Sequence, residues 1–470
     1  MFSQRSRTRS ISIFRLFIDA VKGKPQDFTE GSIDRAIFLL AVPMILEMAM
    51  ESLFAVVDVF FVSRLGANAI TTIGLTELVL TLVYTLAIGI SISATALVAR
   101  RTGEKNHDAA AHAGVQTIYI GIGISLLISI VGFFYSDDIL ALMGAEEGVI
   151  REGRNYIRIM LCGNSVIFLL FLINGVFRGV GNAAIAMRSL WIANGINIIL
   201  CPTFILGLGP FPELGLTGAA VATTIGRGCG VLYQLYHMVR GSKLLPMVKK
   251  HLLFSGEIIG KILKTSIGGT LQFFIASCSW IFLGRFIAEF GTEAMSGQTI
   301  AIRIIVFAIL PAWGMANAAA TLVGQNLGAG KPDRAEQSVW RAGFLNLVFL
   351  GIVSVIFIIL APNIIRIFSD DPQIIAYGTE SLRYISIGYI FYAYGMVIPQ
   401  AFNGAGDTLT PTLINLFGFW GFQIPLAYLL AFKFDLGPTG VFMSIPIAEI
   451  VIAIAGIIIF KKGKWKKVKI

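Results

Sequence analysis

The chain has 470 residues, of which 56% are hydrophobic and only 14% are charged. A soluble globular domain needs more charged surface than this, so the composition excludes an ordinary soluble protein. The formal net charge of +10 does not indicate a nucleic-acid partner, because the basic residues stand mostly in short connections and at the chain ends, as in membrane proteins.

Long apolar segments indicate membrane-spanning helices. Residues 36–61, 118–135 and 344–361 run for about 18 to 26 residues with little or no charge, and a bilayer core takes about 20 helical residues to cross. Lipid offers no hydrogen-bond partners, so each such segment must satisfy its backbone internally as a helix. In chain order the sequence predicts twelve helices, at 36–62, 72–99, 114–135, 155–177, 184–207, 215–239, 260–287, 296–323, 340–361, 379–402, 410–433 and 438–460.

The charges of the connections predict the orientation. The N-terminal segment, the connection with Arg100 and Arg101, and the link at 240–259 are basic, whereas Asp137 and Asp138 stand in an acidic connection. Basic connections face the cytoplasm. We therefore expect a multi-pass protein of a bacterial or archaeal plasma (inner) membrane with both termini cytoplasmic, and a basic C-terminal tail that contacts anionic lipid headgroups.

The two halves of the chain repeat each other. Four matches occur in the same order, the first three at a shift of 225 residues and the last at a shift reduced by three. Each half holds six predicted helices, an even number, so the repeat is parallel with a pseudo-two-fold axis along the membrane normal. The matches are Leu65–Ala69 with Phe290–Ala294, Val98, Gly103, Asp108 and Ala110 with Val323, Gly328, Asp333 and Ala335, Phe177–Gly181 with Phe402–Gly406, and Leu214–Gly218 with Leu436–Gly440.

The expected fold is therefore an all-α membrane protein with twelve transmembrane helices in two six-helix lobes. Two such lobes can enclose a cleft that opens alternately to each side as they rock. The expected parts are an N-terminal cytoplasmic segment (1–30), an N-lobe (31–239), a linker (240–259), a C-lobe (260–460) and a basic tail (461–470).

Several motifs resemble the MATE (multidrug and toxic compound extrusion) family of the MOP flippase superfamily. They are Pro43 with Val57–Val62 and Leu65-Gly66, the repeated Gly179-x-Gly181-Asn182 and Gly404-x-Gly406-Asp407, and Gln325–Gly330 after the eighth helix. The resemblance covers about Gly31 to Lys462. It implies a V-shaped pair of lobes and the exchange of an organic, often cationic or amphipathic, compound for H⁺ or Na⁺.

Three acidic residues form a stripe on the first helix. Glu47, Glu51 and Asp58 lie within about 40° of one another on one helix face. A carboxylate in hydrocarbon costs several kcal/mol unless it is paired, protonated or hydrated, typically about 3 kcal/mol at a helix centre. The stripe is therefore our candidate for coupling-ion binding, with a possible Na⁺ site at Asp58 and Glu51. The alternative is that Asp58 is only interfacial or a hydrogen-bond acceptor.

The resemblance also shows departures around this stripe. Asp58 stands at the family's helix-1 aspartate, and Glu51 stands where many members have glutamine. Cys201 occupies the place of an aspartate that one subgroup carries on the fifth helix, so that subgroup's two-aspartate proton site is incomplete here. We expect Glu47 or Glu51 to supply the missing charge, and Asn197 to hydrogen-bond Asp58.

Arg227 stands in the middle of the sixth helix, where an unpaired arginine is costly. Glu47 and Glu51 lie at a similar depth, so either is the expected partner. The pair could be structural or could act as a switch in substrate binding or coupling.

Further cavity candidates are single polar or aromatic residues on apolar helices. Glu77 can bind a cation or simply face water, and Trp280 and Trp313 can stack on a cationic compound or serve as packing. Gln272 is the polar residue of the seventh helix, and Arg303 is an isolated charge whose alternative role is structural.

No feature of the sequence indicates an enzyme or a cofactor. The four cysteines form no CxxC pair and the four histidines form no catalytic spacing, and no nucleotide-binding motif occurs, so transport should be driven by a gradient of H⁺ or Na⁺. The expected partners are a small-molecule substrate, the coupling ion and membrane lipids, without nucleic acid, around a monomer. The alternatives are a lipid-linked oligosaccharide flippase of the same superfamily, a non-transporting scaffold or a channel.

Overall fold

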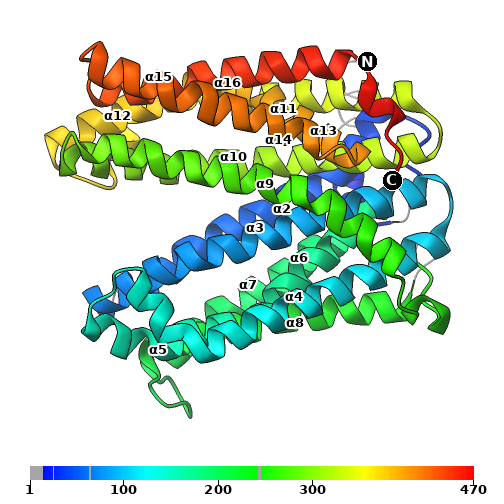
Figure 1. Cartoon of the computed structure of the whole chain (residues 1–470), viewed down its shortest axis with the longest axis horizontal. Coiled ribbons are helices and arrows are strands. Elements are labelled where there is room, and N and C mark those ends of the chain that lie inside the picture. The colour runs from blue at the N-terminus through cyan, green and yellow to red at the C-terminus, as the bar shows by residue number, and fades with distance from the viewer. Residues whose placement is uncertain (1–13, 25, 63–64, 242–244) are drawn as a thin grey trace, which may run out of the picture.

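The computed structural model describes residues 14–24, 26–62, 65–241 and 245–470, without the side chains of 55–59, 62 and 67. The described residues contain helices and no strand. The helices form two lobes that approach each other at the end holding both termini and diverge toward the other end (Figure 1). A short helix at residues 14–22 precedes the first span.

The N-lobe and the C-lobe contain corresponding helices in the same order. The N-lobe has α2 (Ile33–Val62), α3 (Ala67–Gly103), α4 (His107–Leu142), α5 (Glu147–Cys162), α6 (Asn164–Gly179), α7 (Ala183–Leu206) and α8 (Gly215–Arg240). The C-lobe has α9 (Gly256–Ala288), α10 (Thr292–Gly328), α11 (Pro332–Arg366), α12 (Pro372–Ile387), α13 (Tyr389–Ala405), the continuous segment α14 (Leu409–Asn415), η3 (Leu416–Gln423), α15 (Ile424–Tyr428) and η4 (Leu429–Lys433), and α16 (Pro438–Lys461).

The predicted twelve-span, two-lobe fold is confirmed. Ten described spans, one of them formed by α5 and α6 together, are long and apolar enough to cross a membrane, and the pair α12 and α13, bent by 56°, forms another. Helix α8 completes twelve, although it is less apolar and carries Arg227. Most helices extend beyond the predicted apolar segments, because polar residues at helix ends can sit at the headgroup level.

The internal repeat is also visible in the helix boundaries. Helix α3 and helix α10 begin and end at residues that differ by 225, as do α5 and α12. Both halves break their fourth span at an equivalent glycine, Gly163 or Gly388. The breaks were not predicted, since both flanking segments are apolar enough for one continuous span.

Two glycines bring the lobes into backbone contact near the termini. A Cβ added at Gly103 of α3 would lie 1.9 Å from the carbonyl oxygen of Gln325 in α10. A Cβ at Gly328 of α10 would lie 2.1 Å from the carbonyl oxygen of Arg100 in α3. Gly103 corresponds to Gly328 in the repeat, and Arg100 to Gln325, so the two contacts are equivalent under the pseudo-two-fold axis.

The same reciprocity recurs deeper in the membrane. A Cβ at Gly89 of α3 would lie 2.5 Å from the amide nitrogen of Thr270 in α9, and one at Gly314 of α10 would lie 2.8 Å from that of Ile45 in α2. These four positions are again exchanged by the repeat. We call the four glycines Gly89, Gly103, Gly314 and Gly328 the glycine seam; it holds α2 and α3 against α9 and α10.

The C-terminal tail crosses from one lobe to the other. Arg100 donates hydrogen bonds from Nη2 to the main-chain oxygens of Ala405 (3.1 Å) and Val468 (3.0 Å). Lys466 pairs with Glu336 of α11 at 2.6 Å. This hydrogen bond raises the pKa of Lys466, so the ammonium stays charged at neutral pH.

The N-terminal segment makes a similar bridge. Arg188 of α7 donates to the main-chain oxygen of Val21 at 2.8 Å, and Arg334 of α11 donates to that of Gly31 at 2.8 Å. The lobes are therefore held together near the termini by the seam and by both chain ends.

We expect Gly103→Ala and Gly328→Ala to part the lobes at the end that holds the termini, because an added methyl cannot fit against the opposing carbonyl. The measurement is the distance between spin labels at the exposed Val239 and Gln337, which should lengthen. Gly74→Ala is the matched control on α3, since a Cβ there meets nothing within 4 Å. Equal distances in all three variants would contradict the role of the seam.

Candidate functional site

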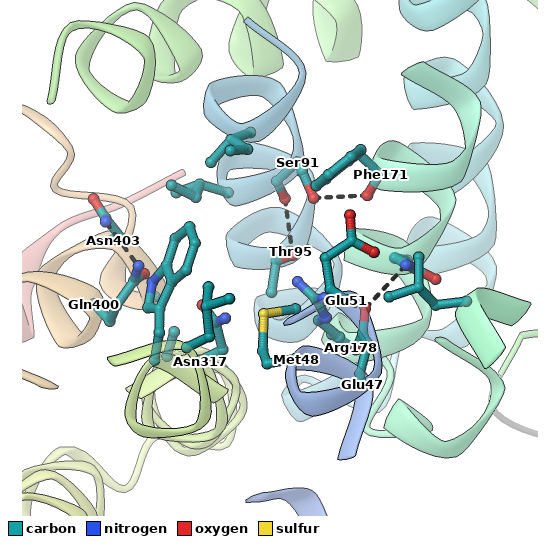
Figure 2. A pocket seen from close by; sticks show the side chains of 18 of the residues that line it. Glu47, Met48, Glu51, Ser91, Thr95, Phe171, Arg178, Asn317, Gln400 and Asn403 are labelled. Carbon is teal, nitrogen blue, oxygen red and sulfur yellow. Dashed lines mark hydrogen bonds and ion pairs between the residues drawn. The ribbon is translucent and has the colours of Figure 1, made fainter. Parts of the chain in front are cut away.

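A cavity of about 150 Å³ lies between the lobes (Figure 2). Helices α2, α3, α6 and α7 of the N-lobe contribute acidic, polar and apolar side chains, and α10 and α13 of the C-lobe contribute Trp313 and amide side chains. The lining residues are Glu47, Met48, Glu51, Ile88, Ser91, Ile92, Thr95, Leu170, Phe171, Asn174, Arg178, Leu190, Leu310, Trp313, Asn317, Ala320, Gln400, Asn403 and Gly404.

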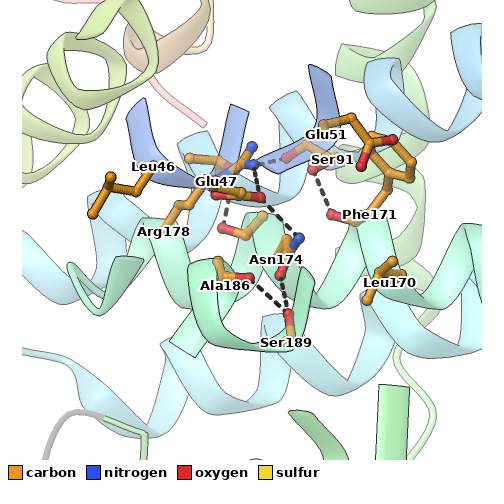
Figure 3. Close-up of polar contacts among 12 residues, drawn as sticks. Leu46, Glu47, Glu51, Ser91, Leu170, Phe171, Asn174, Arg178, Ala186 and Ser189 are labelled. Atoms are coloured by element: carbon orange, nitrogen blue, oxygen red, sulfur yellow. Dashed lines mark hydrogen bonds and ion pairs between the residues drawn. The ribbon is translucent and has the colours of Figure 1, made fainter. Parts of the chain in front are cut away.

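Glu47 is the most buried acid of the cavity wall, with 1% of its surface exposed. It forms an ion pair with Arg178, and Asn174 donates a hydrogen bond to it at 3.1 Å (Figure 3). Asn174 in turn accepts a hydrogen bond from Ser189 at 3.1 Å, and Gln234 donates to Ser189 at 3.0 Å. The pair therefore stands at the end of a buried polar network that connects α2, α6, α7 and α8.

The C-lobe contains a neutral counterpart of this pair. Gln272 and Asn403 are the repeat equivalents of Glu47 and Arg178, and they exchange two hydrogen bonds, at 2.9 and 3.2 Å. Gln272 is 4% exposed and also donates to the main-chain oxygen of Thr408. The predicted cavity residue Gln272 thus lies behind Asn403 and holds it against the cavity, and the charged residues of the described cavity lining come from the N-lobe.

The carboxylate partner predicted for Arg227 is Glu51. The two side chains lie 3.5 Å apart, and Asn194 donates to the other carboxylate oxygen of Glu51 at 3.0 Å. The guanidinium of Arg227 also lies over the rings of Phe54 and Tyr84, at 5.8 and 5.6 Å from their centroids. The Arg227 side chain is 5% exposed and that of Glu51 is 28% exposed, so the acid faces the cavity and the arginine lies behind it.

Arg227 also has a counterpart of opposite charge. With the repeat shift reduced by three, it corresponds to Glu449 of α16, which is 6% exposed and hydrogen-bonds Tyr392 of α13. The two lobes therefore share a fold but not a charge distribution.

The outer part of the acidic stripe is described only in part. Asp58 lies in helix α2, but its side chain is outside the described residues, as is any Na⁺ site that it would share with Glu51. Asn197 is buried and donates to the hydroxyl of Thr223 at 2.9 Å. The predicted bond between Asn197 and Asp58 therefore stays a prediction.

The remaining candidates divide between the cavity and other sites. Trp313 lines the cavity and packs against Phe273, with ring centroids 5.4 Å apart. Trp280 packs in the hydrophobic core of the C-lobe, and Arg303 and Glu77 have exposed side chains. These three residues lie outside the described cavity lining.

Sequence reasoning missed Arg178 and Asn174. Arg178 directly precedes the repeated Gly179-x-Gly181 motif, which we used only for the internal repeat and the family resemblance. A comparison of the two halves could have indicated the ion pair of Glu47 and Arg178, because the second half changes both of its members. Gln272 stands at the position of Glu47, and Asn403 stands at the position of Arg178.

Two homologous six-helix lobes with a polar cavity between them define a membrane transporter built from parallel repeats. A family profile described as MatE matches residues 43–203 and 270–429. The chain therefore belongs to the MatE family of multidrug and toxic compound extrusion transporters, and it is a transporter and not an enzyme.

Known relatives match along nearly their whole length. The chain is 25% identical to the probable multidrug resistance protein YoeA of Bacillus subtilis, covering 95% of this chain and 97% of the relative. It is 26% identical to the probable multidrug resistance protein NorM of Thermotoga maritima, covering 93% and 94%. A solved MATE structure in complex with MaL6 superposes with a TM-score of 0.89 at 25% identity, over 95% of this chain and 100% of the other.

We expect Glu47→Gln to lower the free energy of unfolding by about 3 kcal/mol, because it leaves the charge of Arg178 buried without its partner. The measurement is unfolding of the detergent-purified protein, and the double variant Glu47→Gln with Arg178→Gln should recover part of the loss. Glu257→Gln is the control, since it breaks only the exposed pair with Lys261 and should change stability by less than about 1 kcal/mol. Equal losses in the free energy of unfolding for Glu47→Gln and Glu257→Gln would contradict a buried ion pair at Glu47.

Proposed function

We propose that the chain is a secondary active exporter that releases an organic, cationic or amphipathic compound in exchange for H⁺ or Na⁺. The observation that carries this proposal is the placement of two carboxylates, Glu47 and Glu51, on the wall of the cavity between the lobes. The names of relatives support an exported drug-like substrate, since two describe multidrug resistance and one, MepA of Staphylococcus aureus, describes multidrug export.

Glu51 is the better candidate for direct exchange. It is more exposed to the cavity than Glu47, and its bond to Arg227 is longer than an ordinary charge-assisted hydrogen bond. A proton or a Na⁺ on this carboxylate cancels its attraction for Arg227 and for a cationic compound. One carboxylate cannot serve the ion and a cationic compound at once, and this competition provides the differential affinity that antiport requires.

Glu47 suits a different role within the same proposal. Its Oε2 accepts no hydrogen bond from the described residues, whereas Oε1 holds both Arg178 and Asn174. Oε1 therefore anchors α2 to α6, and Oε2 is the oxygen at which an ion or proton could bind without breaking the anchor.

The cavity walls suit an amphipathic compound. Phe171 and Trp313 face the cavity from opposite lobes, and the other lining side chains divide between seven apolar and nine polar or charged ones. A volume of about 150 Å³ is smaller than the roughly 300 to 1,000 Å³ of sites for drug-sized ligands. The lobes would therefore move further apart around the bound compound.

The direction of opening follows from the basic connections. With the termini in the cytoplasm, as the positive-inside rule favours, the closed end of the V is cytoplasmic and this conformation faces outward. A solved relative described as an outward-facing multidrug resistance MATE transporter superposes with a TM-score of 0.88, at 26% identity over 95% of this chain. The inward-facing state would then require the glycine seam to part and both chain ends to release one lobe.

The second candidate is the flippase. A MOP superfamily transporter from Pyrococcus furiosus, at 26% identity and a TM-score of 0.87, is described as having a reversed pocket polarity that suggests a different function. An anionic lipid-linked sugar would need a strongly cationic cavity. The lining here holds two acids, Glu47 and Glu51, against one base, Arg178, which favours a cationic substrate.

The coupling proposal is tested by transport in proteoliposomes with separately imposed pH and Na⁺ gradients. We expect Glu51→Gln and Asp58→Asn to reduce gradient-driven transport about tenfold or more, because the neutral side chains cannot exchange a charge. The gradient that drives the wild type identifies the coupling ion.

Glu77→Gln is the control for these variants, because it removes an acid whose side chain lies outside the cavity lining. It should transport at nearly the wild-type rate. Full gradient-driven transport by both Glu51→Gln and Asp58→Asn would overturn the assignment.

A further inference from the structure

An apolar groove runs along the outer side of the C-lobe, away from the cavity. It has a volume of about 510 Å³ and lies between α16 and the segment formed by α14 and η3. Its walls are apolar over most of its length, and two lysines, Lys462 and Lys464, stand at one end. The walls include Ile414, Phe417, Val451, Ala455 and Ile459, with Thr410 as a polar member.

The length of the groove matches one membrane leaflet. From Val451 to Lys462 the helix rises about 17 Å, at about 1.5 Å per residue. Half of the hydrocarbon core of a bilayer is about 15 Å thick. An acyl chain in the groove would therefore place its headgroup at the level of the two lysines.

The lysines are held in place by a buried anchor. The chain turns at Gly463, with φ of 69°, and Trp465 then packs fully buried on the ring of Phe460, with ring centroids 4.7 Å apart. Lys462 and Lys464 flank this turn and are exposed. Their ammonium groups are therefore presented by ordered backbone and not by a free tail.

We propose that this groove binds an anionic phospholipid from the leaflet on the side of the termini, with one acyl chain along α16 and the phosphate at Lys462 and Lys464. A long apolar channel that ends in two cations complements a lipid of negative net charge. The site lies outside the transport cavity, so it does not depend on which compound or ion the protein moves.

The test is binding of phosphatidylglycerol and phosphatidylcholine to the full chain in detergent, measured by native mass spectrometry. We expect phosphatidylglycerol to bind more tightly, and Lys462→Gln with Lys464→Gln to weaken its binding about tenfold while phosphatidylcholine changes little. Ala455→Trp fills the groove and should weaken both lipids.

Two matched control variants distinguish specific lipid binding in the groove from general attraction between the basic tail and anionic lipids. Lys467→Gln with Lys469→Gln removes the same charge from the same tail outside the groove, and Ile454→Trp adds the same bulk on an exposed face of α16. Both controls should bind lipid as the wild type does. Equal weakening by the two lysine pairs, or no effect of Ala455→Trp, would overturn the proposal whether or not transport is coupled to an ion.

Discussion

The cost of a charge in a membrane without a partner determines where the polar residues of this protein lie. Hydrocarbon cannot hydrate a carboxylate or a guanidinium, so each must find a partner or contact water. Glu47 meets Arg178 and Glu51 meets Arg227, and both pairs lie in the N-lobe beside the cavity between the lobes. The remaining wall of the cavity consists of apolar, amide and hydroxyl side chains, which tolerate burial without an ion.

Duplication explains both the symmetry and the asymmetry of the molecule. The backbone contacts of the glycine seam are exchanged by the pseudo-two-fold axis, because each lobe presents the same two glycines to the same two helices of the other. The side chains at the cavity do not follow this symmetry: an ion pair in one lobe corresponds to an amide pair in the other. In the proposed transport cycle the lobes would rock on this repeated backbone, and the charged side chains of the cavity lining would all move with the N-lobe.

Much of the fold could be predicted from the sequence, and less of the site. Apolar length predicts spans because a bilayer has a fixed thickness, and the repeat predicts two lobes because matched residues recur at one shift. The ion pairs were harder to predict, because Glu47 and Arg178 stand 131 residues apart and spacing in the sequence carries no information on their contact. The partner of Arg227 was narrowed to two acids by depth alone, and only the side-chain geometry selects Glu51. The breaks at Gly163 and Gly388 were missed because hydropathy does not register backbone bending.

The arginines that tie the chain ends to the lobes bind peptide carbonyls and not side chains. Arg100 and Arg334 hold Val468 and Gly31 by their main-chain oxygens, which every amino acid supplies. Such hydrogen bonds depend on the position of the backbone and not on the identity of the side chain at the bonded residue. The side chain of Val468 can therefore vary without loss of its bond to Arg100, whereas Gly31, with φ of 72°, and the buried Trp465 restrict what can replace them.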